Sequence, residues 1–394
     1  MPLRVVHVAS SDVNGGAARA ANRLHQGLRL LGHDSRMLVA QRLGDDPSVV
    51  SFFPSGRFPD RVARVLRRRR IAADFAPYRA TRPAGFEAFS DDRSEYGPEV
   101  PRQLPPCDVV NLHWVAGFVD YRAMLAGIPR GVPVVWTLHD MNVFTGGCHY
   151  DDGCGRFARA CGACPQLGSR GEHDLSRQVW LRKRSVFESA AGRPLHVVAD
   201  SEWLAAEARR SSALAGVPVT SILYGLDTGV FAPRDPAAAR AELGIPAGAR
   251  VVLFVADSVE NRRKGFPLLL EALGGMRDAP GLLLLSIGRG RPAVPEGLPH
   301  LHFEHVASDR LLSTLYSAAD VFVIPSLQEA FGQTALEAMA CGTPVVGFEA
   351  GGIPEMVRPG VTGLLARCGD VAGLREAVLA LLSDDGLRAR MGAS

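Results

Sequence analysis

The most constraining stretch of this sequence lies between residues 321 and 347. It opens with the apolar run Val321-Phe322-Val323-Ile324, which is typical of a buried parallel strand. A loop follows, and then a segment rich in helix formers that stops at Gly342. A second apolar run, Val345-Val346, comes directly after it. This order predicts a strand–loop–helix–strand unit, and such units bind ligands at the carboxyl ends of their strands.

Two glutamates stand eight positions apart in this unit. Glu329 falls in the loop at the mouth of the first strand, and Glu337 falls on the following helix. The helix start at Phe331-Gly332 offers free backbone N–H groups, which attract a phosphate. A carboxylate beside such a site can accept hydrogen bonds from ribose hydroxyls. The alternative interpretation is that both glutamates are ordinary helix-cap and surface charges.

The residues around these glutamates carry a family resemblance. The segment P-S-L-Q-E-A-F-G-Q-T-A-L-E-A-M-A-C-G-T-P-V-V, followed by G-G-I-P-E, resembles the signature of the GT4 glycosyltransferases. The resemblance extends from about residue 224 to about residue 380 and continues more loosely through the first half. It implies an α/β protein of the GT-B fold, with two Rossmann-like domains facing each other across a deep cleft. It also implies transfer of a sugar, with retained configuration, from a nucleotide-diphosphate donor.

The length of 394 residues accommodates two domains with separate cores. We predict an N-terminal, acceptor-binding domain over residues 1–223, with an irregular insertion at 44–106 and a cysteine-rich one at 146–168. The resemblance places a nucleotide-sugar-binding domain at 224–375. Residues 376–394 are expected to form a C-terminal helix, shorter than the crossover helix usual in the family.

Composition excludes several other classes of protein. An apolar content of 47% with a net charge of +3 is typical of a globular enzyme and gives no strong attraction to nucleic acid. No apolar run reaches transmembrane length, and the chain opens on a strand-like segment with no signal peptide. We therefore expect a cytoplasmic protein.

Two cations are candidates for contact with the donor diphosphate. Lysine occurs only at Lys183 and Lys264, and Lys264 follows Arg263 just before a glycine. Where the family usually has Gly-Arg, this chain has Ala256-Asp257-Ser258, so we assign the diphosphate contact to Arg263 and Lys264. The alternative is a solvated loop charge. By resemblance, Glu337 binds the ribose and Glu329 holds a sugar hydroxyl.

Further donor contacts are assigned by resemblance alone. Gly288 ends a buried strand and would let the nucleotide lie close, and His305 belongs to a segment that reads the base edge. Residues 351–355, with their glycine pair and glutamate, are expected to support the donor pocket.

The first half offers glycines and histidines at predicted strand ends. Gly15 and Gly16 lie between the first strand and an alanine-rich helix, although the dinucleotide pattern G-x-G-x-x-G is absent. His113 and His139 each follow an apolar run, which places them at the ligand crevice of a parallel sheet. His139 lies in T-x-H-D, which resembles the family position near the transferred sugar. A structural, hydrogen-bonded histidine is the alternative, above all for His113.

Two other segments are unusual. Residues 61–70 include six arginines, which indicates a solvated helix or, alternatively, a surface that docks on an anionic membrane with a lipid-linked acceptor. Four cysteines, Cys148, Cys154, Cys161 and Cys164, fall within seventeen residues. In a cytoplasmic chain this cluster favours a structural zinc over disulfides, and free or redox-paired cysteines in a small insertion are the alternative.

The sequence therefore predicts a hexosyl-type glycosyltransferase that moves a sugar from a UDP- or GDP-sugar to a saccharide or lipid-linked hydroxyl in cell-surface polysaccharide or glycoconjugate synthesis. No Asp-x-Asp occurs, so no metal cofactor is expected in catalysis. The alternatives are a nucleotide-sugar epimerase of the same fold and a non-catalytic, zinc-stabilised binding protein. A dehydrogenase would require the missing glycine motif.

Overall fold

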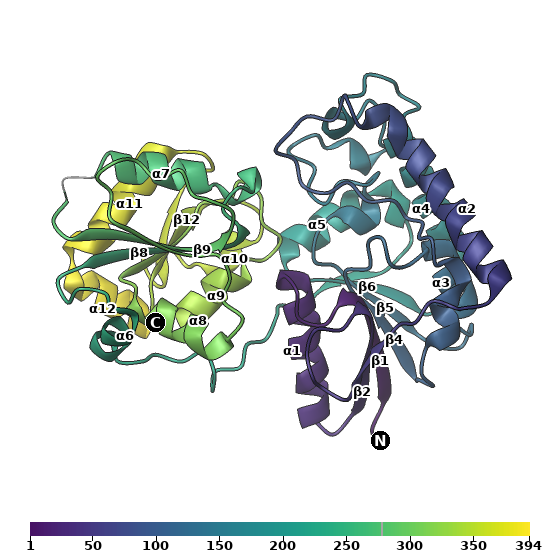
Figure 1. The fold of residues 1–394 in the computed structure, drawn as a ribbon, viewed down its shortest axis with the longest axis horizontal. Helices are drawn as coiled ribbons and strands as arrows, with labels where there is room; N and C mark the ends of the chain where they lie inside the picture. Colours follow the sequence, from purple (N-terminus) through teal and green to yellow (C-terminus); the bar gives the residue numbers. More distant parts are fainter. Residues whose placement is uncertain (277–278) are drawn as a thin grey trace. The chain divides into compact units, whose positions relative to one another are not determined.

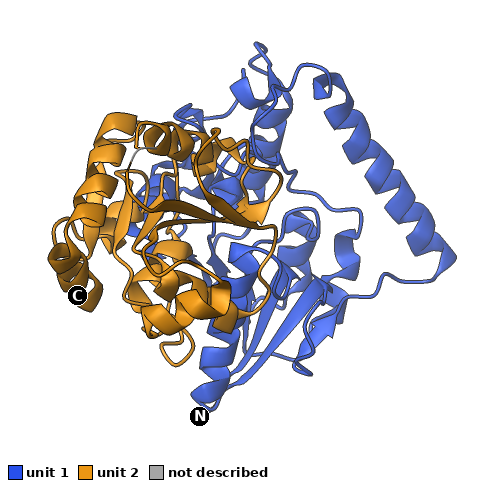
Figure 2. Ribbon diagram, turned by 60° about the vertical axis from the view of Figure 1, so that its left-hand side comes forward, with its two compact units in different colours: residues 1–224 blue, residues 225–394 orange. Residues whose placement is uncertain are grey.

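The chain divides into two compact units, Met1–Tyr224 and Gly225–Ser394 (Figure 2). The structure is a computed structural model that describes residues 1–276 and 279–394. Each unit has one parallel sheet with helices packed around it (Figure 1). The predicted α/β architecture with two Rossmann-like domains is therefore confirmed.

The first unit has a seven-stranded sheet in the order β3-β2-β1-β4-β5-β6-β7, and every strand pair is parallel. Its strands are β1 (Arg4–Ser11), β2 (Asp34–Gln41), β3 (Val49–Ser51), β4 (Val109–Leu112), β5 (Val134–Thr137), β6 (Leu195–Ala199) and β7 (Val219–Ser221). Its α-helices are α1 (Gly16–Leu30), α2 (Phe58–Phe75), α3 (Tyr121–Gly127), α4 (Leu175–Ser189) and α5 (Glu202–Arg210). Strand order reverses between β1 and β4, which is where ligands bind in sheets of this type.

The second unit repeats this plan with six parallel strands in the order β10-β9-β8-β11-β12-β13. These are β8 (Arg250–Ser258), β9 (Leu282–Arg289), β10 (His300–Phe303), β11 (Val321–Ile324), β12 (Val345–Phe348) and β13 (Gly363–Ala366). The helices are α6 (Pro236–Leu243), α7 (Phe266–Gly274), α8 (Asp309–Ala318), α9 (Gln333–Ala340), α10 (Ile353–Met356), α11 (Val371–Ser383) and α12 (Asp385–Ala393). The order reverses between β8 and β11.

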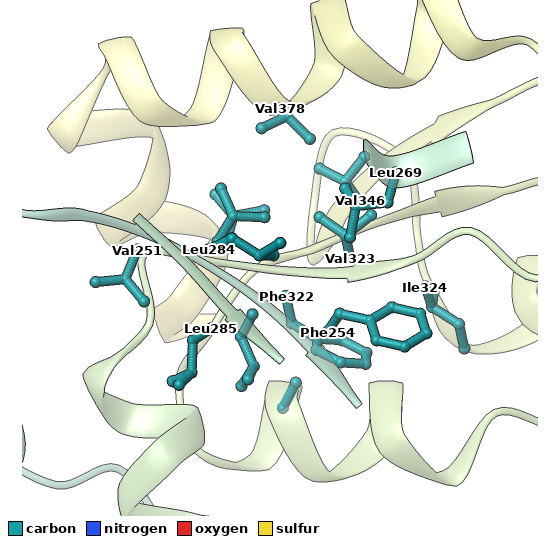
Figure 3. Packing of buried hydrophobic residues seen from close by; sticks show 14 of the residues in the cluster. Val251, Phe254, Leu269, Leu284, Leu285, Phe322, Val323, Ile324, Val346 and Val378 are labelled. Carbon is teal, nitrogen blue, oxygen red and sulfur yellow. The ribbon is translucent and has the colours of Figure 1, made fainter. Parts of the chain in front are cut away.

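The apolar runs of the sequence become the core of the second unit. All four residues of β11 and all four of β12 are buried. Figure 3 shows Val323 and Val346 on the face of the sheet that Val378 of α11 covers, and Phe322 beside Phe254 on the opposite face. Parallel strands covered by helices on both faces need such continuous apolar runs, which explains why this stretch was recognisable in the sequence.

Two further segments outside the sheets form helices. The arginine-rich part of residues 44–106 forms α2, an 18-residue helix with no buried residue. The end of the chain forms a second short helix, α12, after α11. No helix among residues 1–276 and 279–394 is both long and apolar enough to cross a bilayer.

We predict that Gly265→Ala destabilises the second unit by roughly 2–3 kcal/mol. Gly265 has φ of +71°, and a Cβ there would lie 1.8 Å from the carbonyl oxygen of Pro325, so neither the conformation nor the space suits alanine. Gly274, at the end of α7, has no neighbouring atom within 4 Å of the position that a Cβ would occupy, and it serves as the control. Urea unfolding of both variants measures the difference, and equal midpoints would contradict the assignment.

Candidate active site

One cluster of charged side chains occupies the carboxyl end of the second sheet. The loop after β11 carries Glu329, and the loop after the neighbouring strand β8 carries Arg263 and Lys264 in a short 3-10 turn, η8 (Arg262–Lys264). Strands β8 and β11 are the pair at which the strand order reverses. The structure therefore brings three predicted site residues together at the position where this type of sheet binds its ligand.

The three side chains form one ion-paired group, the Glu329 cluster. Lys264 Nζ lies 2.6 Å from Glu329 Oε2, and Arg263 Nη1 lies 3.4 Å from the same oxygen. Arg263 Nη1 also donates to the carbonyl oxygen of Gln328 at 2.6 Å, and Ser326 Oγ donates to Glu329 Oε2 at 3.2 Å. These side-chain contacts of Glu329 thus converge on one carboxylate oxygen.

Glu329 is ionised despite its burial. Burial on its own would raise the pKa of this carboxyl, but the charges of Lys264 and Arg263 and the hydrogen bonds from Lys264 and Ser326 lower it to about 2. Two cations share one carboxylate, so the cluster retains one net positive charge near neutral pH.

Glycines hold the loop of Glu329 at close range. Gly351 has φ of +59°, and a Cβ there would lie 1.9 Å from the carbonyl oxygen of Glu329. The N–H of Gly352 donates to that same oxygen at 2.9 Å. Only glycine allows the two backbones to approach so closely, and the support of a donor pocket by residues 351–355 stays a prediction.

Helix α9 begins next to the cluster and carries the second glutamate. Gly332, with φ of +93°, is the N-cap of α9, as expected from the sequence, and the preceding Phe331 is buried. Glu337 is also buried, and its Oε2 accepts a hydrogen bond from the Tyr316 hydroxyl at 3.0 Å. Glu337 is therefore not an ordinary surface charge, and its contact with ribose stays a prediction.

The two remaining donor candidates lie further along the sheet, one on a strand and one in a loop. Gly288 belongs to β9 and has φ of +151°; a Cβ there would lie 2.8 Å from the carbonyl oxygen of Ala256 on β8. Strand packing alone therefore requires glycine at this position. His305 is exposed in the loop after β10. Nothing in this geometry tests their contact with a nucleotide.

In the first unit, three histidines form a continuous hydrogen-bonded series, the histidine chain. His7 Nδ1 lies 2.9 Å from His113 Nε2, and His113 Nδ1 lies 3.0 Å from His139 Nε2. His139 Nδ1 contacts the hydroxyl of Tyr224. These residues come from β1, from the ends of β4 and β5, and from the last position of the unit.

The hydrogen-bond partners assign a direction to this chain. The Tyr224 hydroxyl donates to the carbonyl oxygen of Leu138 at 3.4 Å, which leaves the Tyr224 oxygen as the acceptor of an N–H from His139 Nδ1. His139 Nε2 then accepts from His113 Nδ1–H, and His113 Nε2 accepts from His7. The last ring atom, His7 Nε2, is buried without a hydrogen-bond partner in the described part of the chain. Both nitrogens of His139 are thus engaged within the protein.

All three rings are neutral at physiological pH. Burial lowers the pKa of His7 to about 3, that of His139 to about 4, and that of His113 well below its ordinary value. A small cavity borders His113, Trp114, His139 and Asp140. His139 therefore lies at a recess, as expected for a residue at a strand mouth.

On the other side of this recess, Asp140 accepts hydrogen bonds from three neighbouring residues. Its Oδ2 accepts hydrogen bonds from Trp114 Nε1 at 2.8 Å and from His149 Nδ1 at 2.6 Å, and its Oδ1 accepts the N–H of Asn142 at 2.8 Å. The histidine that follows β5 and the aspartate beside it thus both face this recess.

The predicted glycine turn of the first unit is also present. Gly15 and Gly16 lie at the start of α1, where Gly15 is the N-cap with φ of +87°. A turn of this conformation favours glycine with or without a ligand. The contact of this turn with a ligand therefore stays a prediction.

The structure does not support the predicted structural zinc at Cys148, Cys154, Cys161 and Cys164. The four thiols do border one cavity. However, no group of three or more ligand side chains among residues 1–276 and 279–394 is arranged to hold a metal ion. With no cation beside them, burial raises the pKa of Cys161 to about 12 and that of Cys148 well above its ordinary value, so both thiols are protonated. All four are free cysteines, as in the alternative interpretation.

Several residues of these sites were missed in the sequence. Ser326 stands only three positions before Glu329, and its proximity could have identified it. Tyr316 depends on how α8 packs against α9. Lys183, one of only two lysines, is fully buried; its Nζ contacts the carbonyl oxygens of Asn142 and Thr145, and burial lowers its pKa to about 8. Because lysine is so rare in this chain, the presence of Lys183 in the sequence could have indicated a special role for it.

The whole chain resembles several solved structures. The chain matches sucrose-phosphate synthase from Thermosynechococcus elongatus with a TM-score of 0.65 at 21% identity, covering 99% of this chain and 92% of that one. It matches Anabaena Alr3699/HepE, solved with UDP and glucose, with a TM-score of 0.62 at 18% identity, covering 99% and 93%. At these identities the likeness shows the fold, which is GT-B.

The sequence comparison finds similarity to one family over part of the second unit. Residues 249–384 match the family model described as glycosyl transferases group 1. Over this range the second unit is therefore similar to the group 1 glycosyltransferases, the group that the sequence motifs resemble. D-inositol 3-phosphate glycosyltransferase of Segniliparus rotundus is 40% identical over 36% of this chain and 34% of its own length. Its Mycobacterium tuberculosis counterpart is 39% identical over 40% and 35%. The chain spans about a third of the length of these relatives.

We predict that acid weakens the first unit through His113. The unfolded His113 binds a proton below pH ~6.5, whereas the folded one does not until far lower pH, so stability from this group is present at pH 7 and is lost as pH falls. The difference in unfolding free energy between wild type and His113→Asn should shrink by about 2 kcal/mol between pH 7 and pH 5. Thermal or urea unfolding at both pH values measures this, with His196→Gln, a half-buried residue of β6, as the control. A difference that is independent of pH would contradict a neutral, buried His113.

Proposed function

We propose that this protein is a retaining glycosyltransferase that moves a sugar from a nucleotide-diphosphate donor to a hydroxyl acceptor. The observation that carries the proposal is the Glu329 cluster, because it combines fixed positive charge with an orienting carboxylate at the ligand-binding edge of the second sheet. The cluster belongs to the segment that matches the group 1 glycosyltransferases.

The costly step in such a reaction is departure of the diphosphate from the anomeric carbon. Negative charge develops on the leaving oxygens while the sugar becomes oxocarbenium-like. Arg263 and Lys264 meet this charge with the one net positive charge of the cluster, and the first N–H groups of α9 add to it. The side chains supply the positive charge themselves, so catalysis requires no divalent cation.

Glu329 has two roles in this proposal. Its Oε2 holds both cations, and among the described residues no donor contacts Oε1. Oε1 is thus available to accept a hydroxyl of the transferred sugar and so to place the anomeric carbon. Glu329 is an orienting group here, not a covalent nucleophile. Glu337 binds the ribose hydroxyls, and His139 lies beside the transferred sugar.

The donor is a UDP- or GDP-sugar, and the acceptor is a saccharide or a lipid-linked sugar used in cell-surface polysaccharide or glycoconjugate synthesis. The donor class is supported by the likeness to HepE, whose structures contain UDP and UDP-glucose. A hydroxyl acceptor is supported by the relatives named D-inositol 3-phosphate glycosyltransferase, since inositol is a cyclic polyol. We place the protein in the cytoplasm, at the inner face of the membrane where lipid-linked acceptors lie.

We expect Lys264→Ala and Arg263→Ala each to lower kcat about a hundredfold, because each removes one charge that stabilises the departing diphosphate. The matched control is Arg262→Ala, which removes the same charge from the neighbouring, exposed position of η8. Release of nucleoside diphosphate, measured with and without chelator, reports turnover. Full activity of both variants, or complete loss of wild-type activity with chelator, would refute the assigned roles.

Donor class is tested by thermal shift with UDP, GDP, their sugars and NAD. We expect a nucleoside diphosphate or its sugar to raise the Tm of wild type. Glu337→Gln should require at least tenfold more ligand for the same shift, because a ribose contact is lost. Stabilisation by NAD alone would favour a dehydrogenase instead.

The type of reaction needs a separate test. Release of nucleoside diphosphate only when an acceptor is present separates a transferase from an epimerase. The anomeric configuration of the product tests whether the configuration is retained.

A further inference from the structure

Helix α2 has its apolar and charged faces in the reverse of the usual arrangement. A surface helix normally turns its apolar stripe toward the core and its charges toward water. In α2 no residue is buried, and the large apolar side chains are exposed: Phe58 is 77% exposed and Leu66 is 60% exposed. Val62 and Val65 are also exposed, and so is Phe53 just before the helix.

These apolar residues share one face of the helix. Positions 58, 62, 65 and 66 follow the i, i+4, i+7, i+8 spacing that places side chains along a single stripe. Helix α2 lies along the outer edge of the first unit in both ribbon views (Figures 1 and 2). The stripe therefore faces away from the core of its own unit.

Arginines occupy the face that contacts the first unit. Arg64 Nη1 pairs with Glu99 Oε2 at 2.7 Å, and its Nη2 donates to the carbonyl oxygen of Ser55 at 2.8 Å. Arg67 Nη1 donates to the carbonyl oxygen of Glu95 at 2.8 Å. These contacts fix the rotation of the helix, so the apolar stripe cannot turn inward without breaking them.

Further arginines border the apolar stripe. Arg61, Arg69 and Arg70 are exposed, and Arg57 precedes the helix. Within α2, six arginines against two aspartates give a net charge of +4. Both aspartates bind groups of the first unit, since Asp60 accepts from Ser55 Oγ and Asp74 from Arg93 Nη2. The outer surface thus combines an apolar stripe with a positive border.

We propose that α2, with Phe53 and Arg57 before it, is a membrane-docking surface for bilayers with anionic headgroups. The apolar stripe enters the boundary between headgroups and acyl chains, and the flanking arginines bind lipid phosphates, their stems lying along the apolar layer. A second copy of this chain would oppose one +4 helix with another, and a nucleic acid would leave Phe58 and Leu66 in water. This inference does not depend on the donor chemistry proposed above.

Sedimentation of the full chain with vesicles tests the proposal. Wild type should bind equimolar phosphatidylglycerol and phosphatidylcholine vesicles, bind phosphatidylcholine alone far more weakly, and lose affinity at high salt. Phe58→Ser with Leu66→Gln should lower the affinity at least tenfold, because the inserted apolar area is lost. Arg69→Gln with Arg70→Gln should lower it roughly tenfold or more on anionic vesicles only.

Matched controls lie elsewhere on the molecule. Leu30→Gln removes another exposed leucine, and Arg209→Gln with Arg210→Gln removes another adjacent arginine pair; both should bind like wild type. The α2 variants should keep wild-type nucleoside diphosphate release with a soluble acceptor, which separates this inference from the proposed function. Absence of vesicle binding, equal binding by the α2 variants, or self-association or nucleic-acid binding that Leu66→Gln abolishes would overturn it.

Discussion

The close approach of three backbone segments determines the geometry of the second unit's site. The loop after β11 passes within van der Waals contact of Gly265 at Pro325 and of Gly351 at Glu329 itself. Because the loop is held from both sides, the Glu329 carboxylate has little freedom to move relative to Lys264 and Arg263. Charge preorganised in this way needs no rearrangement when negative charge develops on a ligand, which is the most effective form of electrostatic stabilisation.

Much of this arrangement was predictable because the controlling patterns are local. The apolar runs of β8, β9, β11 and β12 indicate buried parallel strands, and the glycine at the start of α9 indicates a helix N-terminus. Parallel strands have their carboxyl ends at one edge, so residues after β8 and β11 were expected to lie near each other. The sequence could not reveal that Lys264 and Arg263 share one oxygen of Glu329, because that depends on side-chain geometry.

The histidine chain illustrates a different limit. His7 pairs in register with Asn111, two residues before His113, so strand order and register bring the two rings together. Neither register nor order is visible in a single sequence. The link to Tyr224 was harder still, because this residue contacts His139 from 85 positions away in the sequence.

The cysteine cluster shows why spacing alone was misleading. Four cysteines within seventeen residues do converge on one cavity. Convergence is not coordination, however, because ligation requires thiolates directed at one point. Here the sulfurs take part in local packing instead; Cys161 Sγ, for example, accepts the N–H of Gly146 at 3.1 Å. Burial without a cation favours the protonated thiol.

The scarcity of lysine has a practical consequence for experiments on this chain. Its two lysine side chains differ sharply in accessibility: Lys264 is partly exposed within the Glu329 cluster, whereas Lys183 is fully buried beneath the loop that follows β5. Amine-directed acylating reagents and cross-linkers therefore meet one accessible lysine in the native protein, and it marks the proposed donor site. Labelling of Lys183 reports opening of the first unit. A single reagent therefore reports ligand binding, as protection of Lys264, and unfolding of the first unit, as labelling of Lys183.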